Sequence, residues 1–196
     1  MSELQANLIF NPLWNDDVAK RTIIKWNTTG LFQLNATKYS WAKSLYQVMV
    51  WNFWVPEKVS GLWEDAVQFK NSLTEDEKRA YKWILSFLIF LDSIQTVNLP
   101  NFSEYITAPE VNLILSIQAY QEAIHSQSYA TILETVVVSK DREEIYYFWK
   151  NDEHLLERNK FIGWIYQDFI DNPNDKNFFR WVIGNFLLES IYFYNW

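Results

Sequence analysis

The hydrophobic positions along the chain recur with helical spacing, and no alternation typical of strands persists. Over residues 38–53 apolar side chains fall every three or four positions, which places them on one face of an α-helix. Pro56 should end this helix near Trp54, because the residue before a proline avoids helical geometry. Residues 1–37 have no sustained period and predict an extended arm. We therefore divide the chain into an arm, 1–37, and a helical domain, 38–196.

The strongest helix signal begins at Thr74. Thr74 and Glu77 have the spacing of a capping box, which opens a long helix from Glu75 to about Val97. The centre of this helix is apolar nearly all round, so we expect it to be buried. It nevertheless carries Asp92, and a buried carboxylate must be paired, hydrogen-bonded or bound to a metal. Pro100 should end the helix.

The remaining elements are also predicted to be helices. Thr107 and Pro109 indicate the start of a second long helix that should run to about Val138. Helices are further predicted over residues 63–73, 142–150 and 152–170, and from about 174 onward. The last of these stays apolar and aromatic to Trp196 and includes Glu189. The fold class is all-α.

Composition narrows the chemistry that this chain can support. It has no cysteine and two histidines, so any metal must be bound by carboxylates and imidazoles, ligands that suit iron or manganese. The net charge is −7 and no basic run stands out, which excludes a nucleic-acid phosphate reader. The N-terminus lacks the pattern of a signal peptide, and the longest apolar run covers about half a membrane span. We therefore expect a cytoplasmic protein without a membrane segment.

One short stretch could hold a metal. Glu122, His125 and Tyr129 follow one another at helical spacing and should share one helix face. Glu-x-x-His directed into a helical bundle is part of the ligand set of dimetal carboxylate proteins. Asp92 and Glu189 are further acidic residues on helices predicted to be buried. The surroundings of the other histidine, His154, are polar, which favours a surface or capping role.

Each of these residues also has an ordinary structural explanation. Asp92 could be a hydrogen-bonded core residue, Glu122 and His125 a salt-bridged pair, Glu189 a local cap, and Tyr129 a core tyrosine. Taken together, these explanations leave several polar groups buried in neighbouring apolar helices, each at a cost of about 1–3 kcal/mol. One shared metal cluster would remove that cost.

These stretches resemble the small (beta) subunit of class I ribonucleotide reductase. The resemblance spans about residues 40–196 and rests on four segments: Asn52-Phe-Trp-Val-Pro-Glu57, Leu91-Asp-Ser-Ile-Gln95, Gln121-Glu-Ala-Ile-His-Ser-Gln-Ser-Tyr129 and Leu188-Glu-Ser-Ile-Tyr-Phe-Tyr194. It implies a ferritin-like helical bundle that holds a dinuclear iron or manganese cluster. In that family the small subunit stores a one-electron oxidant and passes it to the large subunit, which reduces ribonucleotides to deoxyribonucleotides.

The resemblance also implies roles for single residues. Asp92, Glu122 and His125 would be ligands of the first metal, with Glu122 bridging, and Glu189 would be a ligand of the second. Tyr129 matches the tyrosine that is oxidised to a radical, and Phe193 one of the apolar residues that shield it. Trp54 matches a tryptophan implicated in electron transfer.

The sequence departs from the family pattern in one respect. A second Glu-x-x-His and a tail that binds the large subunit are expected in the family, and neither occurs in these 196 residues. Two explanations compete: a split subunit and a truncated product. We favour a split subunit, completed by a complementary C-terminal chain and assembled as a dimer. Two alternatives are a self-assembling ferritin-like oxidase or metal-storage protein, and a non-catalytic helical fragment that binds a reductase subunit.

Overall fold

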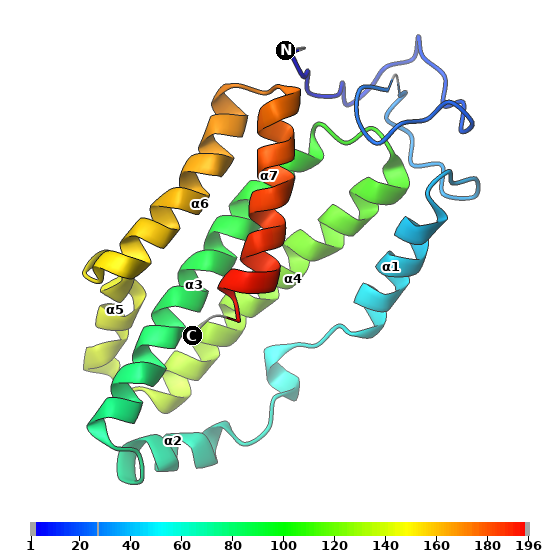
Figure 1. The fold of residues 1–196 in the computed structure, drawn as a ribbon. Helices are drawn as coiled ribbons and strands as arrows, with labels where there is room; N and C mark the ends of the chain where they lie inside the picture. Colours follow the sequence, from blue (N-terminus) through cyan, green and yellow to red (C-terminus); the bar gives the residue numbers. More distant parts are fainter. Residues whose placement is uncertain (1–2, 27, 195–196) are drawn as a thin grey trace.

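The computed structural model describes residues 3–26 and 28–194, and within them the regular structure is helical (Figure 1). Two isolated β-bridges, Glu3–Asn174 and Ile24–Ile106, occur outside the helices. The α-helices are α1 (Ser40–Trp51), α2 (Leu62–Asn71), α3 (Glu75–Ser103), α4 (Pro109–Val136), α5 (Ser139–Tyr147), α6 (Glu153–Asp171) and α7 (Asp175–Leu187). Short 3₁₀ turns cover Pro56–Lys58 and Phe148–Lys150, and a π-helical turn, Leu188–Tyr192, continues α7. The predicted all-α fold is confirmed.

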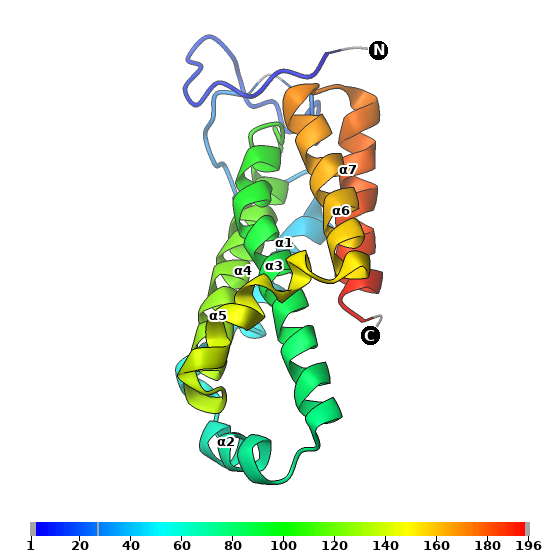
Figure 2. The same ribbon diagram turned by 90° about the vertical axis from the view of Figure 1, so that its left-hand side faces the viewer.

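Helices α3 and α4 form the centre of the molecule. They pack against each other along their length, with α6 and α7 on one side and α1 running along α4 on the other (Figures 1 and 2). The capping box predicted at Thr74 is present: the Thr74 hydroxyl accepts from the Glu77 backbone N–H, and Glu77 accepts from the Thr74 N–H. The two central helices therefore hold Asp92 and the Glu-x-x-His motif against each other.

The predicted end of α3 at Pro100 is wrong, because the helix continues to Ser103 with Pro100 inside it. Proline removes one backbone hydrogen bond, but Leu99 and Phe102 on either side are almost completely buried and hold the last turn in place. The predicted start of α4 is confirmed: the helix begins at Pro109, with Ala108 as its N-cap. The Thr107 hydroxyl, next to the cap, donates to the carbonyl of Thr22 in the arm.

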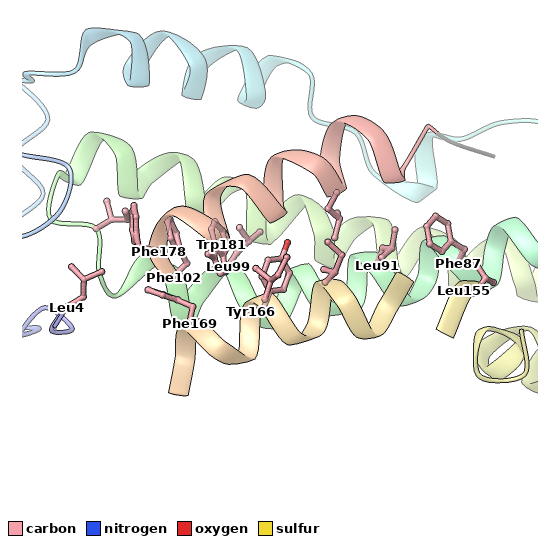
Figure 3. Close-up of a cluster of buried hydrophobic side chains, with 14 residues drawn as sticks. Leu4, Phe87, Leu91, Leu99, Phe102, Leu155, Tyr166, Phe169, Phe178 and Trp181 are labelled. Atoms are coloured by element: carbon pink, nitrogen blue, oxygen red, sulfur yellow. The ribbon is translucent and has the colours of Figure 1, made fainter. Parts of the chain in front are cut away.

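Apolar side chains from α3, α6 and α7 form the larger of two core clusters (Figure 3). Phe102 stacks on Trp181 with 3.6 Å between ring centroids, and Leu155, Ile162 and Phe169 of α6 are fully enclosed. A smaller cluster, which includes Phe69, Leu85, Leu133 and Ile145, joins α2, α3, α4 and α5. The candidate metal ligands lie on the same central helices as these clusters.

The N-terminal arm is held by a buried ion pair. Arg21 lies 2.8 Å from Glu110 at the start of α4, and each side chain is 1% exposed. The other carboxylate oxygen of Glu110 accepts from the backbone N–H groups of Lys38 and Tyr39, just before α1. Glu110 therefore joins the arm, α1 and α4.

Helix α3 is long and apolar enough to cross a membrane, but it has the features of a core helix. It packs between α4, α5 and α6 and carries the buried polar residues Asp92, Gln95 and Asn98. The sequence prediction for Asn195 and Trp196 lies outside the described residues.

Candidate metal centre

Three predicted ligands meet between α3 and α4. Asp92 comes from α3, while Glu122 and His125 lie one turn apart on α4. One ligand atom of each lies within 4.8 Å of the other two. His125 Nδ1 is 3.5 Å from Asp92 Oδ2 and 3.4 Å from Glu122 Oε2. This separation allows the three side chains to bind one ion together.

The carboxylate of Asp92 carries the clearest signal for a metal. The residue is 1% exposed, and neither of its side-chain oxygens accepts a hydrogen bond from any of the described residues. A carboxylate withdrawn from water in this way requires a positive partner. His125 is the neighbour of Asp92 that can carry a positive charge, and it is itself a metal-ligand type. The donor set, two carboxylates and one imidazole, therefore fits iron or manganese.

The charges of Asp92, Glu122 and His125 shift the pKa values of their neighbours. Interaction with Asp92 first and Glu122 second raises the pKa of His125 to about 10, so the imidazole is protonated at neutral pH. Burial raises the pKa of Glu122, and the charge of Asp92 adds to this effect. The imidazolium therefore takes the place that a metal ion would occupy between the two carboxylates.

Glu189 approaches the same region from the end of α7. It lies in the π-helical turn Leu188–Tyr192, an irregularity that is frequent at functional sites. Burial, followed by the charge of Glu122, raises its pKa to about 7. Its Oε1 accepts hydrogen bonds from Gln95 Nε2 at 2.6 Å and from Gln118 Nε2 at 3.2 Å. Glu189 is therefore adjacent to the three-residue group without belonging to it.

The structure places Tyr129 and Trp54 next to the ligands. Burial, followed by the charge of Asp92, raises the pKa of Tyr129, so the phenol stays protonated. Trp54 stacks on the His125 ring with 5.5 Å between centroids and 20° between planes. Phe193 packs against the larger core cluster, whereas Tyr129 packs against the smaller one. The shielding of Tyr129 by Phe193 stays a prediction.

Several polar residues near Glu189 were not identified from the sequence. The amides of Gln95, Gln118 and Asn185 each lie one helical turn from a predicted ligand. Tyr166 of α6 is 2% exposed, its hydroxyl has no partner among the described residues, and burial followed by the charge of Glu189 raises its pKa. The sequence signal that could have identified these three amides is their position, three or four residues from a predicted ligand on an apolar helix. His154 is exposed at the start of α6, in agreement with the surface role predicted for it.

Comparison with known proteins identifies the family to which the chain belongs. The family described as "Ribonucleotide reductase, small chain" matches residues 31–195. The chain belongs to this family. Among small-chain proteins, it is 50% identical to the ribonucleoside-diphosphate reductase subunit beta of Aquifex aeolicus, over 99% of this chain and 28% of that protein. It is 48% identical to the corresponding subunit of Treponema pallidum, over 98% of this chain and 54% of that protein.

A solved small-chain structure shares the fold. The R2 subunit of Clostridium botulinum ribonucleotide reductase superposes with a TM-score of 0.91 at 48% identity, covering 98% of this chain and 60% of that one. The ferritin-like bundle predicted from the sequence is thereby confirmed. The chain spans from about a quarter to three fifths of the length of these relatives.

Proposed function

We propose that this chain is the N-terminal part of a ribonucleotide reductase small subunit and contributes Asp92, Glu122, His125 and Glu189 to a dinuclear metal site. The observation that carries the proposal is the buried carboxylate of Asp92, which has no hydrogen-bond donor within residues 3–26 and 28–194 and lies beside Glu122 and His125. Membership of the small-chain family supports the same assignment. Iron and manganese both satisfy this donor set.

The metal pair, once bound, would supply the oxidant that removes one electron from Tyr129. The chain itself provides the conditions for keeping the resulting radical. Tyr129 is largely withdrawn from water among the side chains of the smaller core cluster, and the raised pKa of its phenol keeps the proton in place until oxidation. Trp54, stacked on the ligand His125, would conduct electrons between the site and the protein surface, because the residue is 40% exposed. Phe193 would add to the apolar enclosure.

The site needs ligands from outside these 196 residues. A two-metal carboxylate site uses two Glu-x-x-His motifs, and the second histidine of this chain, His154, is exposed on α6. Another segment, on the same or a separate polypeptide, would complete the coordination sphere. The split form, with a complementary C-terminal chain, stays our preferred proposal. The completed subunit would form a dimer, act on ribonucleoside diphosphates through the large subunit, and work in the cytoplasm.

Exposed apolar side chains support a covering segment. Phe179, Ile183 and Phe186 of α7 are each more than half exposed, and Trp41, Val48 and Trp51 of α1 are similarly exposed. Helix α7 leads into Glu189, and α1 runs along α4, the helix that carries Glu122 and His125 (Figure 1). A helical segment that covers these faces would also reach the candidate ligands.

The experiment that tests this function is electron paramagnetic resonance after metal loading and exposure to oxygen. The assembled subunit should give a tyrosyl signal, and Tyr129→Phe should abolish it while leaving metal content unchanged. Tyr120→Phe, on the same helix with its side chain more than half exposed, is the matched control and should keep the signal. A tyrosyl signal that survives Tyr129→Phe contradicts the role of Tyr129. A stoichiometric signal from this chain alone contradicts the need for outside ligands.

A further inference from the structure

Three buried or half-buried amides surround the Glu189 carboxylate. Gln95 lies three residues after Asp92 on α3, Gln118 four residues before Glu122 on α4, and Asn185 four residues before Glu189 on α7. Residues three or four apart share one helix face, so each amide points to the same side of its helix as a candidate ligand. The three central helices therefore bring amides and ligands to one place.

Gln95 is held in a single orientation. Its Nε2 donates to Asn185 Oδ1 and to Glu189 Oε1, both at 2.6 Å. An amide nitrogen has two protons, so both are used. Rotation of the amide by half a turn would place its oxygen against the ionised carboxylate, which only accepts hydrogen bonds. Glu189 therefore fixes Gln95 as a donor, and Asn185 Oδ1 accepts its second proton.

Gln118 donates to the same oxygen. Its Nε2 lies 3.2 Å from Glu189 Oε1. Each carboxylate oxygen has two lone-pair sites, and these two amides occupy both sites on Oε1. Both hydrogen bonds that the described residues make to Glu189 end on this oxygen, so Oε2 is the oxygen that stays available.

The Gln95 amide is not explained by packing. Its side chain is fully buried and its Oε1 has no partner among the described residues. A leucine could fill a similar space without leaving a polar atom unsatisfied. Any favourable contribution of this amide must therefore come from its nitrogen, which donates to Glu189.

We propose that Gln95 and Gln118 are positioning residues that hold Oε1 of Glu189 and leave Oε2 as the single oxygen offered to the second metal. This inference rests on the proposed dimetal site. A glutamate without such donors can turn and bind one ion through both oxygens. The two amides prevent that mode because they occupy Oε1, and they fix the direction from which Glu189 reaches the ion. Residues that hydrogen-bond to metal ligands typically change metal affinity 10–100-fold when mutated.

The test is a manganese(II) titration of the assembled subunit, followed by electron paramagnetic resonance and total metal analysis. Gln95→Leu and Gln118→Leu should weaken binding of the second Mn²⁺ by about 10–100-fold and leave the first unchanged. Carboxylate stretching frequencies in infrared difference spectra should also shift from the one-oxygen to the two-oxygen pattern. Gln118 is only half-buried, so Gln118→Leu should fold even where Gln95→Leu does not.

Asn98→Leu is the matched control. Asn98 is a buried amide three residues after Gln95 on α3, and it accepts from Trp181 Nε1 at 3.0 Å. Its loss should lower stability and leave both Mn²⁺ affinities at the wild-type values. The proposal is overturned when the second Mn²⁺ binds to Gln118→Leu as tightly as to the wild type, or when Asn98→Leu weakens it equally. Wild-type protein that binds fewer than two Mn²⁺ overturns the dimetal function itself, and this outcome is recognised before any variant is made.

Discussion

Asp92 and His125 determine the chemistry of the site at the scale of single residues. Asp92 is almost completely buried and has no hydrogen-bond donor in the part of the chain that the structure describes, and the imidazole beside it is held as a cation. A histidine binds a metal only as the neutral imidazole, so a metal must displace this proton. The same carboxylates that stabilise the imidazolium then hold the ion.

Metal binding should therefore release protons. The pKa of His125 is raised to about 10, so at pH 7 the imidazole loses about one proton when the first metal binds. Glu189, whose pKa is about 7, loses about half a proton when the second metal binds. Because binding releases protons, apparent metal affinity should increase from pH 6 to pH 8. Isothermal titration in buffers of different ionisation enthalpy measures both effects. His154→Ala should change neither, and metal binding without proton release would contradict the assignment of His125 as a ligand.

The sequence singled out three side chains that the structure brings together, and it was silent about their neighbours. Glu122 and His125 stood out because Glu-x-x-His has a fixed helical spacing, and Asp92 because a carboxylate is rare on so apolar a helix; their role as metal ligands stays a prediction. Gln95, Gln118 and Asn185 could not be predicted, because an amide on a helix is common and its hydrogen-bond partner belongs to another helix. The approach of Glu189 depends on a π-helical turn, and the sequence carries no signal for such a turn.

At the scale of elements, Glu110 connects the arm, α1 and α4. Its carboxylate pairs with buried Arg21 and accepts from the backbone N–H groups that precede α1. Helix α1 leads to Trp54, so the position of this tryptophan over His125 depends partly on Glu110.

Glu110→Ala should lower the free energy of unfolding by about 3–5 kcal/mol, because it leaves the Arg21 guanidinium buried and unpaired. Chemical denaturation measures this loss, and limited proteolysis should show earlier cleavage within residues 1–37. Lys20→Ala is the control. Lys20 pairs with Asp17 in the same arm but is 73% exposed, so its removal should cost less than about 1 kcal/mol. Equal losses for the two variants would refute the role of the buried pair.

The positions of the helices could be predicted because apolar residues recur every three or four positions along this chain. Helix ends were harder to predict, because they also depend on tertiary contacts. The capping box at Thr74 is local chemistry and was predicted correctly. The helix end predicted at Pro100 was wrong, because the buried neighbours Leu99 and Phe102 hold Pro100 within α3 and their contacts override the local signal.

At the scale of the whole molecule, the exposed apolar face of α7 should bind the segment that completes the site. Phe186 is 65% exposed on this face. Phe186→Lys should leave the helical content of this chain unchanged, because the side chain contributes little to the core, and should lower the amount of assembled two-metal subunit several-fold. Circular dichroism and mass measurement of the complex test this. Val138→Lys, which changes an apolar side chain that is 60% exposed just beyond α4, should assemble normally. Assembly of Phe186→Lys at wild-type levels would exclude this face as the docking surface.

The central claim is that four side chains from α3, α4 and the end of α7 share a pair of metal ions. Anomalous X-ray diffraction from crystals of the assembled subunit loaded with manganese tests it most directly. We predict two peaks about 3.5–4 Å apart, the first bonded to Asp92, Glu122 and His125, and the second bonded to Glu122 and Glu189. Peaks at other residues, or no peak beside Asp92, would contradict the claim.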